Sequence, residues 1–272
     1  MQEHAERLRN EGQIISFVPT MGYLHEGHLS LLRLAANHGD CVILSIFVNP
    51  TQFGPGEDLN AYPRNLKKDT DLAESEGVDI LFTPSERDFY PEGYQTYVTL
   101  ENIPNHLCGL SRSVHFRGVA TIVTKLFNVV KPHIAVFGQK DYQQVLLIRQ
   151  MVRDLNFDVE IVGAPTVRES DGLAMSSRNT NLPAHLRLSA ITLYQSLNKA
   201  QERLNQGIIH ADEIIAETTR FISSHPETDI DYISICDTET LEEIKVIDRN
   251  VLMALAVKVG GVRLIDNMVL SI

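Results

Sequence analysis

The stretch that decides the fold is residues 14–48, which read IISFVPTMGYLHEGHLSLLRLAANHGDCVILSIFV. Two apolar runs, 14–18 and 41–48, flank a segment with helical spacing over residues 27–37. Both runs are rich in Val and Ile and do not alternate with polar residues, which is typical of strands buried on both faces. The stretch therefore predicts a strand–helix–strand unit, from which parallel sheets are built.

The same alternation continues through the first two-thirds of the chain. It predicts further strands at 78–82, 133–138 and 159–163, and helices at 65–76, 118–130 and 141–154. Right-handed crossovers bring the carboxyl ends of all these strands to one edge of the sheet, where ligand sites form. We therefore expect an α/β domain over residues 1–175, a Rossmann-like parallel sheet with crossover helices.

The pattern changes after TVRESDGLAMSSRNTNLP (166–183). Helical spacing returns at 185–205 and 210–223, and strands are predicted at 230–236, 251–259 and 262–270. Gly260-Gly261 between the last two strands indicates a hairpin. We expect a smaller α+β domain with antiparallel strands over residues 176–272.

Composition limits the partners and the compartment. The formal net charge is −11 at pH 7, which argues against nucleic-acid or membrane partners, because non-specific binding to either uses a basic surface. No apolar run approaches the length of a membrane span, and the polar start is not a secretory signal, so a cytoplasmic protein is expected. Three scattered cysteines without C-x-x-C spacing indicate neither a disulfide framework nor a zinc site.

One part of the chain has the opposite sign of charge. Between Gly109 and Met151 a single acid, Asp141, stands against six basic residues: Arg112, Arg117, Lys125, Lys131, Lys140 and Arg149. Two interpretations remain open at this point, a solvated face and a positive surface for an anionic ligand.

Polar residues follow the first two predicted strands. His25 and His28 flank Gly27 where the helix is expected to begin, so both imidazoles would lie beside unpaired N–H groups and the positive end of the helix dipole, which favours an anion. After the second strand, Asn49 and Gln52 offer amides that suit a ligand with hydroxyl and carboxylate groups. A simple turn is the alternative there.

Two later stretches carry phosphate-binding chemistry. In FGQKDYQQ (137–144), Lys140 suits phosphate oxygens and Gln144 lies one turn further on, although a Lys140–Asp141 ion pair is the rival interpretation. In MSSRN (175–179), two hydroxyls and a guanidinium can hold the oxygens of a polyphosphate. The second motif alone is weak, because Ser-Ser-Arg occurs in many linkers.

Taken in order, these motifs resemble the pantoate–β-alanine ligase family of the class I nucleotidyl-transfer superfamily, whose signatures are of the HIGH and KMSKS types. The resemblance rests on PTMGYLHEGHLSLL, FVNPTQFGPGEDLNAYPR, HFRGVATIVTKLFNVVKP, FGQKDYQQ, DGLAMSSRN and RLIDN and covers essentially the whole chain. In that family ATP and pantoate give pantoyl adenylate and pyrophosphate, and β-alanine then displaces AMP to form pantothenate. The resemblance thus implies ATP as co-substrate, Mg²⁺, pantoate and β-alanine as substrates, and a homodimer.

The resemblance also implies roles for residues. The catalytic set would be His25, His28 (the usual proton donor), Lys140, Ser176, Ser177 and Arg178. ATP would contact these six and Pro19, Thr20, Met21, Gly22, Gly27, Gly138, Gln139, Asp141, Val167 and Met175. Pantoate and β-alanine would contact Asn49, Gln52, Gln144 and Arg112. Asp69 could help to hold Mg²⁺ through water, although pairing with Lys67 or Lys68 explains this acid equally well.

The chain departs from the family pattern in three places. Residues 112–116 read RSVHF where RPGHF is common, GQKD replaces GEKD, and the chain starts within what looks like the first helix, so an edge strand is expected to be missing. Two alternatives are another class I nucleotidyl-transferring enzyme, such as a tRNA synthetase-like protein, and a non-catalytic nucleotide-binding protein. The acidic charge argues against the first, and the intact His25, His28 and Lys140 argue against the second.

Overall fold

The computed structural model describes residues 1–272 and divides them into two compact units. Unit 1 comprises Met1–Pro104, Arg112–Gln139 and Gln143–Thr166. Unit 2 comprises Asn105–Ser111, Lys140–Tyr142 and Val167–Ile272. Unit 2 therefore includes residues 167–175, which the sequence assigned to the first domain, together with two short segments from earlier in the chain.

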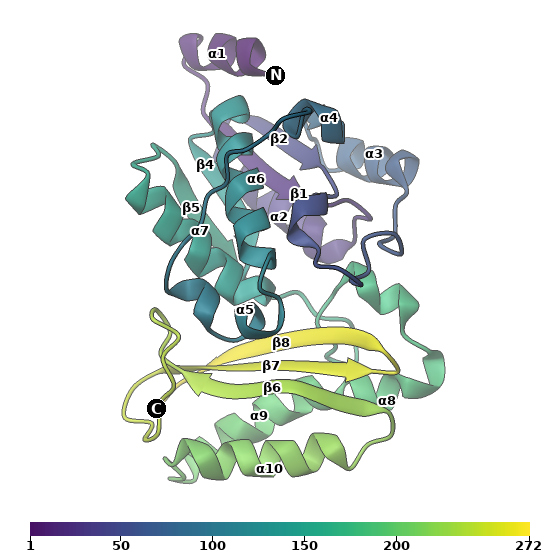
Figure 1. Cartoon of the computed structure of the whole chain (residues 1–272), viewed down its shortest axis with the longest axis vertical. Coiled ribbons are helices and arrows are strands. Elements are labelled where there is room, and N and C mark those ends of the chain that lie inside the picture. The colour runs from purple at the N-terminus through teal and green to yellow at the C-terminus, as the bar shows by residue number, and fades with distance from the viewer. The chain divides into compact units, whose positions relative to one another are not determined.

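Unit 1 is built on a five-stranded parallel sheet in the order β3-β2-β1-β4-β5 (Figure 1). The strands are β1 (Ile15–Thr20), β2 (Cys41–Ile46), β3 (Ile80–Phe82), β4 (Ile134–Gly138) and β5 (Glu160–Ala164). The strand order reverses its direction between β1 and β4, which is the point at which ligands bind in open α/β sheets. The Rossmann-like architecture expected from the sequence is confirmed.

Helices cover both faces of this sheet, and α6 lies in front of it in Figure 1. The helices of unit 1 are α1 (Gln2–Asn10), α2 (Glu26–Ala36), α3 (Leu66–Ser75), α4 (Glu86–Phe89), α6 (His115–Val130) and α7 (Tyr142–Asp154). On β1, the ring of Phe17 contacts Phe127 of α6 at 6.5 Å between centroids, whereas Val18 packs in one apolar cluster with Leu32 of α2. Both faces of β1 are therefore buried, which explains its continuous apolar run.

β1 runs through Pro19 and ends at Thr20, two residues beyond the end of the predicted strand. Proline has no N–H to donate to a neighbouring strand. β4 pairs only with Ser16 and Phe17 of β1, so Pro19 interrupts no pairing on that side. The last residues of β1 therefore extend beyond the part of the strand that pairs with β4, to the edge at which the chain turns into α2.

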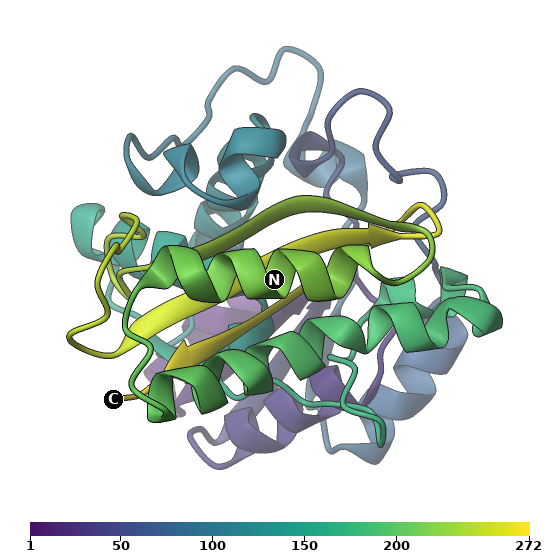
Figure 2. The ribbon, with the colours of Figure 1, turned by 90° about the horizontal axis from the view of Figure 1, so that it is seen from below.

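Unit 2 contains a three-stranded antiparallel sheet of β6 (Thr228–Cys236), β7 (Val251–Val259) and β8 (Val262–Leu270). Gly260 and Gly261 join the last two strands at φ values of +55° and +82°, which confirms the predicted hairpin. The short α5 (Cys108–Ser111) also belongs to this unit. Figure 2 shows α9 (Thr192–Asn205) and α10 (Ala211–Ser223) side by side across one face of the sheet.

The helix predicted over 185–205 is interrupted. A 3₁₀ turn, Ala184–Leu186, leads into α8 (Arg187–Ala190), and α9 begins only at Thr192. The Thr192 hydroxyl donates to the carbonyl oxygen of Ser189 at 2.6 Å, a side-chain bond of the kind that competes with the backbone hydrogen bonds of a helix.

None of the helices of the protein combines the length and hydropathy that a membrane span requires.

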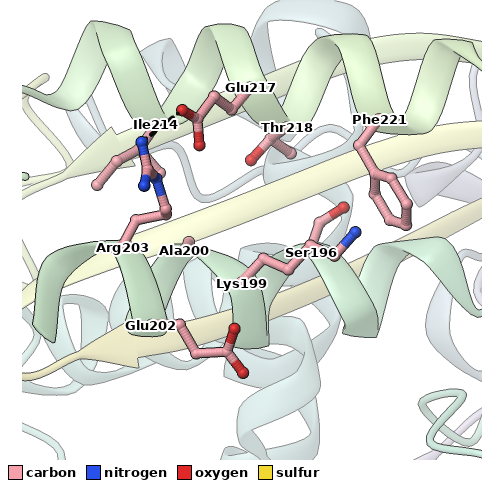
Figure 3. Close-up of a pocket in the computed structure, with 9 residues that line it drawn as sticks. All are labelled: Ser196, Lys199, Ala200, Glu202, Arg203, Ile214, Glu217, Thr218 and Phe221. Carbon is pink, nitrogen blue, oxygen red and sulfur yellow. Dashed lines mark hydrogen bonds and ion pairs between the residues drawn. The ribbon is translucent and has the colours of Figure 1, made fainter. Parts of the chain in front are cut away.

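A pocket lies between α9 and α10 (Figure 3). Arg203 and Glu217 point toward each other from the two helices and form an ion pair at 2.8 Å. The ammonium group of Lys199 lies over the ring of Phe221. The hydroxyl of Ser196, a residue that is only 1% exposed, has no hydrogen-bond partner within the protein.

We predict that Ser196→Ala raises the free energy of unfolding by up to about 1 kcal/mol, because burying a hydroxyl without a partner is unfavourable. Urea unfolding followed by circular dichroism measures the change. Ser189→Ala is the matched control, since Ser189 is equally buried at 1% but donates to the carbonyl oxygen of Pro226 at 3.0 Å. It should lower the free energy of unfolding by about 1 kcal/mol. Equal losses in the two variants would contradict this account of Ser196.

Candidate functional site

The corner between β1 and α2 carries the two histidines. His25 is the N-cap residue of α2, in an extended conformation, and its N–H donates to Nδ1 of His28 at a long 3.4 Å. The two imidazole rings lie 4.1 Å apart between centroids. Both rings therefore lie at the amino end of the helix, as the sequence predicted, where the helix dipole favours negative charge.

The side chain of Asp69 of α3 contacts the backbone of this corner. It is 1% exposed, and its two carboxylate oxygens accept the N–H groups of Tyr23 at 2.8 Å and Leu24 at 2.7 Å. The proposed pairing of Asp69 with Lys67 or Lys68 is wrong: Lys67 pairs with Asp71 at 3.5 Å. Neither lysine competes with the backbone for this carboxylate, because α3 turns Asp69 inward.

A buried amide network follows β2. Asn49, which is 1% exposed, accepts hydroxyl hydrogens from Thr51 at 2.9 Å and Tyr90 at 2.8 Å. Its amide nitrogen donates to Oε1 of Gln52 at 3.2 Å and to the carbonyl oxygen of Gly118 at 3.1 Å. Burial raises the pKa of Tyr90 to about 12, so its hydroxyl remains a donor at neutral pH. All four hydrogen-bonding positions of the Asn49 side chain are filled within the protein.

The first residues of α6 contact the backbone of Gln52 from a second side. A Cβ on Gly118 would lie 2.5 Å from the backbone nitrogen of Gln52, so only glycine allows this approach. Nδ1 of His115 lies 3.0 Å from the backbone oxygen of Gln52. The side-chain nitrogen of Gln52 lies 2.9 Å from the sulfur of Met21, which follows β1. The ends of β1 and β2 thus bring Gln52 and Met21 together.

Arg112, predicted to bind a substrate, is paired within the protein. Its Nε donates to Oε1 of Glu57 at 3.1 Å. Burial alone would raise the pKa of Glu57, but the hydrogen bonds and charge of Arg112 lower it. Other basic residues of the 109–151 stretch are also engaged, since Lys131 pairs with Glu6 and Lys125 lies over an aromatic ring. These basic residues therefore do not form a plain solvated face.

The residues after β4 form a 3₁₀ turn, Gln139–Asp141, which precedes α7. Lys140 and Asp141 both lie in this turn, and they form no ion pair, so the rival interpretation of the motif is wrong. The side-chain nitrogen of Asn267 donates to the carbonyl oxygen of Lys140 at 2.8 Å. Gln144 lies in the first turn of α7, as expected.

In unit 2, residues 167–178 form a closed loop. The N–H of Met175 donates to the carbonyl oxygen of Val167 at 2.9 Å, so these two predicted nucleotide contacts lie side by side. Arg168 fastens the loop to β8 through two hydrogen bonds, 2.6 and 2.9 Å long, to Asp266, which is 3% exposed. Ser177 is buried, and the Ser176 hydroxyl accepts the N–H of Arg178 at 3.3 Å.

Each unit thus gathers its own share of the predicted residues. In unit 1 these are Met21, His25, His28 and Gln52, and in unit 2 they are Val167, Met175 and the Ser-Ser-Arg motif. The sequence analysis did not predict how these residues are held, by the bonds of Asp69 to the backbone and by Tyr90, Gly118, Arg168 and Asp266. Gly118 and Asp266 carried a signal, because HFRGVATIVTKLFNVVKP (115–132) and RLIDN (263–267) belong to the family resemblance.

Comparison with known proteins identifies the family of the chain. The family model for pantoate-beta-alanine ligase matches residues 1–269. A pantothenate synthetase from Desulfatibacillum aliphaticivorans is 57% identical over 271 residues, which cover 100% of this chain and 96% of that protein. One from Thermotoga petrophila is 53% identical and covers 100% of this chain and 97% of that protein.

Solved structures give the same result. A pantothenate synthetase from Thermus thermophilus has a TM-score of 0.93 at 44% identity, with 98% of each chain covered. A pantoate-beta-alanine ligase from Francisella tularensis, complexed with beta-gamma ATP and beta-alanine, has a TM-score of 0.76 at 38% identity and covers 98% of this chain and 95% of that one. With matches of this extent in sequence and in fold, the chain belongs to the pantoate–β-alanine ligase family.

Proposed function

We propose that the chain carries out its family's reaction, the ATP-dependent condensation of pantoate with β-alanine through pantoyl adenylate, with the residues described above. The observation that carries this proposal is the β1–α2 corner, where two imidazoles lie at a helix amino terminus and where Met21 of the same corner contacts the side chain of Gln52. A helix amino terminus stabilises phosphate, and an amide beside it can orient a hydroxy acid.

The ATP contacts that we propose are those that the family resemblance implies. They are 19–22, His25, Gly27, His28, Gly138 and Gln139 as a first set, and Lys140, Asp141, Val167 and 175–178 as a second set. Support comes from the positive dipole of α2 in the first set and from the hydroxyls and cations of the second set. His28, the residue that the resemblance gives as proton donor, and His25 are proposed to steady the phosphoryl oxygens.

Pantoate and β-alanine are proposed to contact Gln52, and pantoate also Gln144. Gln52 is held from two sides, which favours a fixed direction of its amide. Asn49 and Arg112 were also expected to contact these substrates. All four hydrogen-bonding positions of Asn49 are filled within the protein, so a bond to substrate would replace one of them. Arg112 gives two of its five N–H groups to Glu57, so a substrate could accept from the others without displacing Glu57.

The chemistry needs positive charge and alignment more than a nucleophile. The pantoate carboxylate attacks the α-phosphate of ATP, so two anions must meet, and charge builds on the phosphoryl oxygens and the leaving pyrophosphate. Lys140, Arg178 and the hydroxyls of Ser176 and Ser177 would offset that charge. Holding the two reactants in line supplies at best about 7–11 kcal/mol of the remaining gain.

Mg²⁺ fits this chain as an ion brought with the nucleotide. No three His, Cys, Asp or Glu side chains are grouped to hold a metal ion. Mg²⁺ keeps several waters and usually binds through one or two carboxylates and substrate phosphates, so the triphosphate would be its main ligand. When bound, it would neutralise negative charge on the phosphates. A homodimer and a cytoplasmic location stay predictions from the resemblance and the composition.

Pyrophosphate release tests the proposed function directly. The purified protein with ATP and Mg²⁺ should release pyrophosphate only when pantoate is present, and should form pantothenate when β-alanine is added. Removal of Mg²⁺ with EDTA should abolish both steps. Pyrophosphate release with another carboxylic acid but not with pantoate would overturn the substrate assignment, and no release with any acid would favour a nucleotide-binding protein.

We predict that Lys140→Ala lowers kcat for pantoyl-adenylate formation by about 10²–10³-fold, the scale seen when one group that stabilises developing charge is removed. The unfolding midpoint should stay at the wild-type value, because the side chain of Lys140 forms no ion pair within the fold. Lys67→Ala, which removes an exposed lysine paired only with Asp71, should leave both values unchanged. A loss of stability large enough to explain the lost activity would speak against the assigned role.

We also predict that Gln144→Ala raises the KM for pantoate about tenfold and leaves the KM for ATP near its wild-type value, because a hydrogen bond of about 1.5 kcal/mol to one substrate is lost. Steady-state kinetics with each substrate varied in turn measures both constants. Gln150→Ala on the same helix is the control, since Gln150 bonds only to exposed neighbours. An unchanged KM for pantoate would remove Gln144 from the pantoate site.

A further inference from the structure

The turn between β1 and α2 uses side chains to satisfy four successive N–H groups. The N–H of Gly22 donates to Oγ1 of Thr20 at 3.2 Å, and the N–H of His25 donates to His28. Between them, the N–H groups of Tyr23 and Leu24 converge on the Asp69 carboxylate. All four of these bonds end on side-chain atoms, so the shape of this turn depends on a few side chains.

Two successive left-handed residues give the turn its shape. Gly22 has a φ of +81° and Tyr23 a φ of +54°. The second value is unfavourable for a residue with a side chain and persists only where surrounding contacts impose it. Successive N–H groups in such a turn form a concavity that binds anions, as in many phosphate sites. Here the bound anion is the protein's own carboxylate.

The fit of Asp69 in this concavity is close. A Cβ on Gly22 would lie 3.0 Å from Oδ2 of Asp69 and 2.8 Å from the side chain of Ile46. Leu24, which follows, is 3% exposed and fixed in the apolar core. The backbone that enters His25 is therefore held on both sides, by the carboxylate and by the core.

We propose that Asp69 is a positioning residue for the two histidines, acting as a built-in anion that fixes the turn and thereby the direction of His25 and His28. This inference rests on the proposed function, in which those imidazoles face the phosphates of ATP. Asp69 would position the histidines through its hydrogen bonds to the backbone, whether or not Mg²⁺ is bound. It also means that removal of the carboxylate leaves an empty anion site that a small carboxylate can refill.

Chemical rescue tests the proposal. Asp69→Ala should lower kcat for pantoate-dependent pyrophosphate release by about 10²-fold, the cost of misplacing reacting groups by about 1 Å, with little change in the KM for pantoate. Sodium formate should restore activity in a saturable manner, compared with sodium sulfate at equal ionic strength. Formate should not restore His28→Ala. Asp71→Ala, two residues further along α3 and exposed, should behave as wild type.

A second variant guards against loss of the fold. Asp69→Asn keeps the size but offers one acceptor oxygen for two N–H groups, so it should lose activity without responding to formate. Wild-type activity in a folded Asp69→Ala, or a folded inactive Asp69→Ala that formate does not restore, would overturn the proposal. Formate should also raise the unfolding midpoint of Asp69→Ala but not that of the wild type. That readout needs no turnover, so it tests the anion site even where the wild type fails to release pyrophosphate.

Discussion

The central position of β1 is the constraint on which the rest of unit 1 depends. β1 lies between β2 and β4, and all three strands run in the same direction. Their carboxyl ends therefore emerge at one edge, and the chain must turn there after each of them. Apolar residues on both faces fix the strands in register. The polar residues of the turns that follow these strands therefore lie at that edge.

The side chains of the candidate site are held in place by hydrogen bonds and close contacts within the protein. Tyr90 and Thr51 orient Asn49, Asn49 orients Gln52, and Gly118 lets a helix press against the backbone of Gln52. Arg168 and Asp266 do the same for the loop of unit 2. Side chains fixed in this way lose little conformational freedom when a substrate binds, which is the physical meaning of a preorganised site.

The sequence predicted those features that have a local pattern. The strands follow from short apolar runs, α2, α6, α7 and α10 follow from apolar residues at a spacing of about 3.6, and the final hairpin follows from Gly260-Gly261. The helix start at residues 25–28 follows from the glycine and the polar residues there. The interruption before Thr192 escaped prediction because the apolar residues keep their helical spacing across it. The strand through Pro19 escaped because it depends on where a neighbour stops pairing.

Contacts between residues far apart in the chain were beyond such reasoning. Nothing near Asp69 signals that its oxygens meet backbone N–H groups 45 and 46 residues earlier. Likewise, the sequence suggests that Arg112 binds an anionic ligand. The structure shows that it bonds to Glu57, which lies 55 residues earlier in the chain. Such roles arise from tertiary structure, and only the resemblance to a family could hint at them, as it did for the residues around Asp266.

A crystal structure of the protein with a non-hydrolysable ATP analogue, Mg²⁺ and pantoate would test the account most directly. The account predicts nucleotide density at the amino end of α2, against Met21, His25 and His28, and pantoate density against Gln52 and Gln144. Well-defined density for either ligand away from the carboxyl edge of the β1, β2 and β4 strands would contradict it.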